Sequence, residues 1–483
     1  MRHFERNGGL AVVVLQVVLV ACSEDTASGD PEAMHAPTLD SVAADSPSPA
    51  PDAPGPALDA TPDIAPPPVT APLAPGATGT FHVTSDAAGK VGIAVEVRTP
   101  LKPRFSSGEA PIAILVPGGW DADGIKGAAG YDLSKEGFVQ VAFNFPGGGT
   151  GTSLSGGTYD RRGPNCIAAL RDVIRFALGA ATDTTGATLS ANVKTPLAKG
   201  NVGLVGLSNG GNATLTTAGL YGETLTGLSW IVNWESPVGD AMPNVEAGGK
   251  EGGVNPAYSE ATGLFDYTLL AYSSTLPLLK KGGAAPQLGG FYWDLDKNGK
   301  NGAADFIPSP MDSADGKLVF YSEGLANAAV AQGIFPATKV PPHLANATAT
   351  ALFWSQRNGA HHLAALATKL PKLLFTVEAS QEDHVQVAKN HPHVFAQYMG
   401  LRDAGLAFVR LCADKAYVDA AMGKPSDAHD NDANIALTYT TLHGLVNPET
   451  VLTNKAVTAA AEELADRVAT GNLAVNLGSL ITP

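Results

Sequence analysis

The sequence predicts an α/β protein: a doubly wound, mostly parallel sheet with helices on both faces and a large insertion between the sixth and seventh strands. Three observations support this prediction. Short apolar runs recur along the chain with turn residues behind them, as in buried parallel strands. Stretches with helical spacing of apolar residues alternate with these runs. One Gly- and Pro-rich interval, residues 235–370, interrupts the alternation and is the predicted insertion.

The N-terminal segment, residues 1–21, has the pattern of an export signal. Two arginines precede an apolar run that is too short to span a bilayer as a resting helix. The run ends in Leu-Val-Ala-Cys, with Cys22 last, and this resembles the lipobox of bacterial lipoproteins. The resemblance implies a secreted protein anchored to a membrane through acylated Cys22, with Ser23 favouring the outer membrane of the cell envelope. The alternative is an ordinary secretory signal followed by an unmodified cysteine.

Residues 22–78 are composed mainly of Pro, Ala, Asp and Ser with almost no aromatic residues. Such a segment buries too little apolar surface to offset the entropy of ordering, so we expect a disordered tether. The tether precedes a single predicted domain at residues 79–483.

Charge and cysteine content exclude several classes of function. The 483 residues include 46 Asp and Glu against 31 Lys and Arg, a net charge of −15, and no basic cluster, so no nucleic-acid partner is expected. After Cys22 only Cys166 and Cys412 remain, which excludes a disulfide framework and a cysteine-rich metal site. We expect no bridge between these two, because one lies in a predicted helix and the other at a predicted strand.

The elements of the domain follow in order. Residues 91–98 alternate like an antiparallel strand. The buried strands are predicted at residues 112–116, 139–145, 202–206, 228–233, 373–377 and 406–411. The apolar residues of 166–178 share one helical face, and a helix of small residues begins at Asn209.

The segment Gly206-Leu-Ser-Asn-Gly210, with Ser208 at its centre, is the strongest sign of chemistry. A nucleophile elbow needs a serine at a sharp turn between a strand and a helix, with glycines where chains pass closely. Here the pattern directly follows a predicted strand and opens a predicted helix, so Ser208 is the predicted nucleophile. From about residue 80 to residue 420 the chain resembles the α/β-hydrolase superfamily.

This resemblance implies an oxyanion loop at Val116-Pro-Gly-Gly-Trp120, which is similar to the His-Gly-type loop of the family with Pro where His is common. The family pattern pairs the backbone N–H of Asn209 with an N–H from Gly119 or Trp120. Two such donors would lower the barrier by several kcal/mol.

The resemblance also implies an acid after the seventh strand and a base after the eighth, in the chain order Ser, Asp, His. Asp383 is the predicted acid and His429 the predicted base. The alternatives for the acid are Glu382 and Glu235, and those for the base are His443, His384, His391 and His393.

The segment from Asp294 to Asp305 matches a calcium loop of the EF-hand type. The predicted ligands are Asp294, Asp296, Asn298, the backbone carbonyl of Lys300, and Asp305 in the position usually held by Glu. The flanking residues do not predict two helices, so we expect the loop without the full EF-hand. Calcium would brace the insertion, and no organic cofactor is expected. At His361 and His362 no carboxylate or third ligand lies at a useful spacing, so no zinc site is expected.

These features predict a secreted serine hydrolase that cleaves a carboxylic ester by a Ser-His-Asp mechanism, acting on a small-molecule or peptide substrate. One alternative is a secreted serine peptidase that resembles the prolyl-oligopeptidase branch, although no propeller-like repeat precedes the domain. Another is a non-catalytic, calcium-binding surface lipoprotein that keeps the hydrolase scaffold.

Overall fold

The computed structural model of the chain describes residues 71–239, 246–249, 253–259, 262, 264–278, 288–313, 315–335, 340–379, 392–412, 435–436 and 453–473. The predicted signal peptide, Cys22 and the tether as far as residue 70 lie outside these ranges. Residues 71–77, predicted as tether, run along the domain: the N–H of Leu73 donates to Asn192 O (2.9 Å), and Leu73 O accepts from Lys194 N (2.8 Å).

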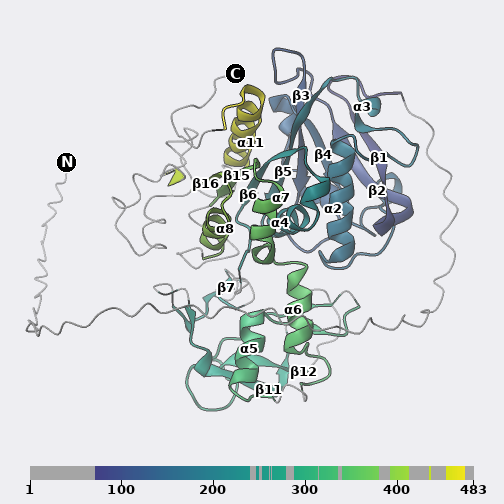
Figure 1. The fold of residues 1–483 in the computed structure, drawn as a ribbon. Coiled ribbons are helices and arrows are strands. Elements are labelled where there is room, and N and C mark those ends of the chain that lie inside the picture. The colour runs from purple at the N-terminus through teal and green to yellow at the C-terminus, as the bar shows by residue number, and fades with distance from the viewer. Residues whose placement is uncertain are drawn as a thin grey trace, which may run out of the picture. The chain divides into compact units, whose positions relative to one another are not determined.

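A nine-stranded sheet is the central element of the described residues (Figure 1), with the strand order β1-β2-β4-β3-β5-β6-β15-β16-β17. Strand β2 is antiparallel to both neighbours, and all pairs from β4 to β17 are parallel. The strands are β1 (Thr78–Ser85), β2 (Gly89–Arg98), β3 (Ala110–Val116), β4 (Val139–Phe143), β5 (Leu197–Leu207), β6 (Leu228–Trp234), β15 (Leu374–Glu378), β16 (Phe408–Cys412) and β17 (Ile435–Ala436). The antiparallel strand and the predicted parallel strands are thereby confirmed to within a few residues.

Helices cover both faces of this sheet. Successive residues of a strand point to opposite faces, and in β3 Ile112 and Ile114 enter one apolar cluster while Ala113 and Leu115 enter another. Helices α2 (Pro164–Ala177), α4 (Asn209–Tyr221), α7 (Leu363–Lys369) and α8 (Pro392–Asp403) complete the first cluster, and α11 (Thr453–Thr470) completes the second. The shorter helices are α1 (Gly124–Gly127), α3 (Leu189–Asn192), η1 (Asp86–Ala88), η2 (Leu133–Glu136), η3 (Gly151–Ser153) and η4 (Gly222–Thr224).

The insertion between β6 and β15 has its own apolar core, which includes Phe291, Trp293, Tyr321 and Leu325. Its elements are β7 (Gly248–Gly249), β8 (Gly253–Val254), β9 (Tyr258–Ser259), β10 (Leu264–Phe265), η5 (Tyr267–Leu269), β11 (Leu270–Pro277), β12 (Leu288–Trp293), β13 (Met311–Asp312), β14 (Val319–Phe320), α5 (Glu323–Ala331) and α6 (Ala347–Ser355). The sequence predicts that the insertion continues to residue 370. In the structure η6 (Gly359–His362) and α7 already pack against α4, a helix of the central sheet. Buried leucines of α7 belong to the core of the sheet, which explains the earlier end of the insertion.

Both described cysteines, Cys166 on α2 and Cys412 on β16, are buried and unbridged, as their predicted positions implied. Within the described ranges no helix combines the length and apolarity needed to cross a membrane.

Candidate active site

Ser208 occupies a sharp turn between β5 and α4. Its backbone has φ 48° and ψ −124°, a region that residues with a Cβ rarely adopt. The N–H of Ser208 donates to Trp234 O (2.7 Å), and Ser208 O accepts from Gly211 N (2.8 Å). The residue is half-buried, so its hydroxyl is held at the surface of the sheet's carboxyl edge by a strained backbone.

The glycines around the serine are required by close packing. A Cβ at Gly210 would overlap the carbonyl oxygen of Val116, and one at Gly211 would overlap the hydroxyl of Ser236. A Cβ at Gly118 would lie 2.9 Å from the Cβ of Ser208. The loop after β3 therefore passes directly beside the serine, as the sequence motif predicts.

Three backbone N–H groups belong to this turn and to the loop beside it, those of Gly119, Trp120 and Asn209. Within the described residues, no hydrogen bond is donated by the amide of Gly119, Trp120 or Asn209. Gly119 is exposed with φ 70°, and Trp120 is half-buried. Backbone amides beside a serine are suited to stabilising the oxyanion that forms when the serine attacks a carbonyl group.

Two side chains donate hydrogen bonds to carbonyl groups of the same loop. The side-chain amide of Asn209 donates to Gly119 O (3.2 Å), and the hydroxyl of Tyr159 donates to Trp120 O (2.6 Å). Burial raises the pKa of Tyr159 to about 12, so its hydroxyl keeps the proton that it donates. The loop is thus fixed from both sides.

Arg162 also binds this loop, and nothing in the sequence marked it. Its Nη2 donates to Gly118 O (3.1 Å) and to Asp121 O (3.4 Å). The guanidinium is buried, with its carbon 3.8 Å from the ring centroid of Phe145. The segment before α2 carries no motif that would predict this contact.

An aromatic cluster from the insertion borders the loop. Trp120 packs against Phe320, Phe353 and Trp354. The rings of Phe320 and Phe353 stack with centroids 4.0 Å apart. The insertion therefore places an apolar cluster against the loop that carries Trp120.

The predicted acid and base, Asp383 and His429, lie outside the described residues, as do the alternatives Glu382, His384, His391 and His443. The structure joins the two remaining alternatives: Nε2 of His393 lies 2.7 Å from Oε2 of Glu235, and both side chains are at most 1% exposed. Glu235 directly follows β6, has φ 42°, and donates its N–H to Glu378 O (3.0 Å). In the described part of the chain, no hydrogen bond links the hydroxyl of Ser208 to a histidine.

No family model matches the chain, and no curated protein matches its sequence. It is similar to the solved structure of brefeldin A esterase, a bacterial homologue of human hormone-sensitive lipase, at 13% identity, with 82% of this chain and 76% of that chain covered and a TM-score of 0.33. It is similar to an arylesterase at 11% identity, with 81% of this chain and 85% of that chain covered and a TM-score of 0.36.

A third similar structure is prolyl oligopeptidase B from Galerina marginata, at 12% identity, with 83% of this chain and 37% of that chain covered and a TM-score of 0.35. Scores at this level carry no argument of their own. The strand order, the single antiparallel β2 inside the sheet and the serine at the turn after β5 decide the fold. The chain has the α/β-hydrolase fold.

The insertion of this hydrolase fold contains the predicted calcium loop. One carboxylate oxygen each from Asp294, Asp296 and Asp305 lies within 4.8 Å of the other two. The side chain of Asn298 donates to Asp296 (2.7 Å), and Gly299 has φ 72° at the bend. These oxygens and the bend fit a hard cation such as Ca²⁺.

The flanks of that loop follow the prediction, whereas the carbonyl of Lys300 as a ligand stays a prediction. The N–H of Lys300 donates to Oδ1 of Asn298 (2.7 Å), which continues the bend. Trp293 pairs with Phe306 as an antiparallel bridge, so two extended segments close the loop. The loop therefore stands without the helix pair of an EF-hand.

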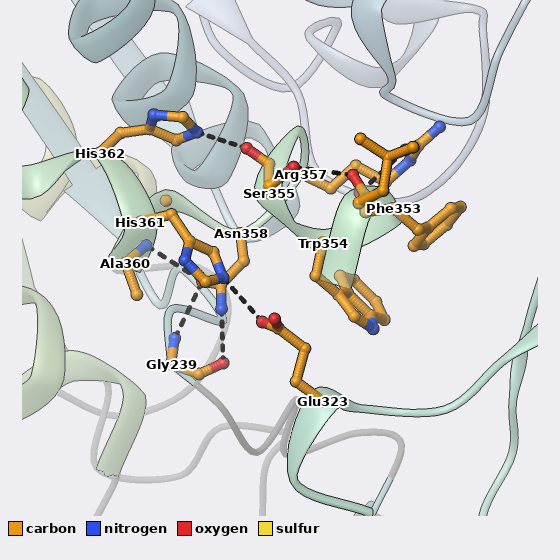
Figure 2. Close-up of polar contacts among 12 residues, drawn as sticks. Gly239, Glu323, Phe353, Trp354, Ser355, Arg357, Asn358, Ala360, His361 and His362 are labelled. Carbon is orange, nitrogen blue, oxygen red and sulfur yellow. Dashed lines mark hydrogen bonds and ion pairs between the residues drawn. The ribbon is translucent and has the colours of Figure 1, made fainter. Parts of the chain in front are cut away.

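His361 has a carboxylate partner that the sequence did not reveal. Its Nε2 lies 2.7 Å from Oε2 of Glu323, the first residue of α5 (Figure 2). Beside it, Asn358 exchanges two hydrogen bonds with the backbone of Gly239. Among the described residues, the Asp294 cluster is the one group of three metal-ligating side chains, and it includes neither His361 nor His362.

Proposed function

We propose that the chain is a serine hydrolase that cleaves carboxylic esters, with Ser208 as its nucleophile. One observation carries the proposal: a strained, half-buried serine at the turn from β5 to α4 lies beside the loop that carries the amides of Gly119 and Trp120. A backbone conformation of this kind costs about 1–3 kcal/mol, and residues strained in this way cluster at active sites.

In the proposed reaction Oγ of Ser208 attacks the acyl carbon while a base removes the hydroxyl proton. The N–H groups of Gly119, Trp120 and Asn209 stabilise the negative oxygen of the tetrahedral intermediate. The alcohol leaves with the proton that the base returns. Water then attacks the acyl-enzyme, which releases the carboxylic acid and restores Ser208.

For the base and acid the proposal keeps His429 and Asp383, because a general base must reach the leaving group and the ring of His393 is fully buried. The pair of His393 and Glu235 is the alternative. Separate His429→Ala and His393→Ala variants distinguish them: the variant lacking the base loses at least about a thousandfold in kcat. A thousandfold loss confined to His393→Ala would transfer the role to His393.

The aromatic cluster next to the loop supports an apolar acyl group in the substrate. Trp120 is the half-buried member of this cluster, and it packs against the buried rings of Phe320 and Phe353. A series of p-nitrophenyl esters with lengthening acyl chains tests this. Each buried methylene should stabilise the transition state by up to about 0.8 kcal/mol, which is measured as a rise in kcat/KM. A p-nitroanilide cleaved faster than every ester would support the peptidase alternative.

We also propose that the loop from Asp294 to Asp305 binds Ca²⁺ and thereby stabilises the insertion. At about ten times its Kd, calcium should add about 1.4 kcal/mol to the stability of the folded state, measured as a rise in Tm. Asp296→Asn should remove this rise. Asp315→Asn is the matched control, because Asp315 is an exposed carboxylate of the insertion outside the cluster. Equal calcium responses in both variants would contradict the site.

We propose that the chain is exported and anchored to a membrane through acylated Cys22, as the lipobox-like segment implies. Metabolic labelling with a palmitate analogue should label the wild-type chain and not Cys22→Ala. The unlabelled variant should also leave the membrane fraction.

Turnover of p-nitrophenyl butyrate by the purified chain tests the central proposal. Ser208→Ala should lower kcat by at least about a thousandfold while the far-UV circular dichroism stays unchanged. Full turnover by a folded Ser208→Ala chain would reject the proposal.

A further inference from the structure

Arg162 is a buried cation beside the loop that follows β3. The residue is 2% exposed, and it forms no ion pair in the part of the chain that the structure describes. Burial lowers the pKa of Arg162, because desolvation disfavours the charged guanidinium, and the nearby Asp121 carboxylate offsets part of this effect. Its hydrogen bonds go to two backbone carbonyls of the loop beside Ser208, those of Gly118 and Asp121.

The bond to Gly118 acts on an amide of that loop. The carbonyl of Gly118 and the N–H of Gly119 belong to one peptide unit, and the described residues contain no cis peptide bond. In a planar trans peptide the N–H points opposite to the carbonyl. Arg162 therefore directs the Gly119 N–H away from the guanidinium, and its positive charge polarises this peptide so that the N–H becomes a stronger donor.

We infer that Arg162 is a positioning residue for the oxyanion loop: its guanidinium orients and polarises the Gly118–Gly119 peptide so that the Gly119 N–H stabilises the tetrahedral intermediate. This inference rests on the proposed hydrolase function. It identifies the residue that orients the Gly119 N–H and makes it a stronger hydrogen-bond donor. In this role Arg162 acts through the peptide, by its hydrogen bond to the carbonyl of Gly118.

The turn that contains Arg162 is strained, and a residue of the insertion forms hydrogen bonds to it. Arg161 and Arg162 have φ 57° and 61°, two consecutive residues with side chains in the left-handed region. Arg357, just after α6, donates from Nε to Arg161 O (2.8 Å) and from Nη2 to Asp160 O (2.7 Å). Its guanidinium also lies over the ring of Phe353, at 3.8 Å (Figure 2). The insertion thus stabilises the turn on which the loop depends.

The experiment compares Arg162→Met with Arg161→Met in the otherwise intact chain. Arg161 shares the strained turn, but its side chain makes no hydrogen bond or ion pair within the described residues, so it is a matched control. With p-nitrophenyl butyrate, Arg162→Met should lower kcat about 10- to 100-fold with KM changed less than about twofold. Binding of an alkyl boronic acid, which forms a tetrahedral adduct, should weaken by a similar factor. Arg161→Met should leave both quantities within about twofold of wild type.

Three results would overturn the inference. They are a kcat for Arg162→Met equal to wild type, equal losses in the two variants, or a loss that appears in KM alone. If Arg162→Met is recovered unfolded, Arg162→Lys answers the same question, because lysine keeps the charge but cannot bridge two carbonyls with a planar fork. Its kcat should fall about 5- to 20-fold, and an unchanged kcat overturns the inference. A wild-type chain without Ser208-dependent turnover would instead refute the proposed function.

Discussion

Replacing Ser208 with glycine should leave the chain more stable than replacing it with alanine. Both variants remove the hydroxyl, so the difference between them reports only the Cβ in a backbone with φ 48° and ψ −124°. Glycine adopts this conformation without strain, whereas alanine keeps the conflict between the Cβ and the backbone.

The expected magnitude follows from two opposing effects. Relief of the strained conformation contributes about 1–3 kcal/mol. The larger conformational entropy of unfolded glycine costs about 0.4–1 kcal/mol relative to alanine. The net gain for glycine is therefore about 1 kcal/mol, within a range of about 0 to 2.5 kcal/mol.

Urea unfolding followed by tryptophan fluorescence measures this difference, since a shift of the midpoint at constant m is a change in stability. Ser85 is the control: its backbone is extended, with φ −154° and ψ 131°, and its side chain forms no cap hydrogen bond. There the glycine variant should be the less stable one, by about 0.4–1 kcal/mol. The same order at Ser208, with alanine the more stable variant, would refute a strained elbow.

Two further predictions concern packing and pH. Gly210→Ala should abolish turnover of p-nitrophenyl butyrate and lower soluble yield, because the added Cβ overlaps the carbonyl oxygen of Val116; a fully active variant would contradict the close approach. Burial raises the pKa of the Glu246 carboxyl from 4.5 to about 7, so the stability that this group contributes is complete below pH 4.5 and is lost as pH rises to about 7. Relative to Glu246→Gln, the urea midpoint of wild type should fall across that window, and parallel curves would contradict the shift.

Local patterns were sufficient to predict the elbow and the strands of the sheet from β2 to β16, whereas the edge strands β1 and β17 were not predicted. Buried parallel strands are continuous apolar runs, and the strands from 112 to 411 were found for that reason. The elbow was predictable because a strand, a glycine-flanked serine and a helix follow one another without interruption around Ser208. Such signals are carried by neighbouring residues and need no knowledge of the fold.

Helix α11 was missed although its pattern is present. Val457, Ala460, Ala461, Leu464 and Ala465 recur at helical spacing and pack on the sheet. The face consists mostly of alanine, which gives a weak hydrophobic contrast with the polar side.

The contacts around the site could not be predicted, because they join residues far apart in sequence. Glu235 and His393 are 158 residues apart, and Arg357 lies 197 residues after Asp160. Arg162 gives no local sign of its role, since its partners are backbone carbonyls whose positions depend on the folded loop. Only the tertiary structure brings these groups together.

Mass spectrometry of the chain after reaction with a fluorophosphonate tests the central claim most directly. The account predicts one phosphonyl adduct on the peptide that contains Ser208, formed with loss of fluoride, and no adduct on the Ser208→Ala chain. An adduct on a different serine, or labelling that survives the substitution, would contradict the assignment of Ser208 as the nucleophile.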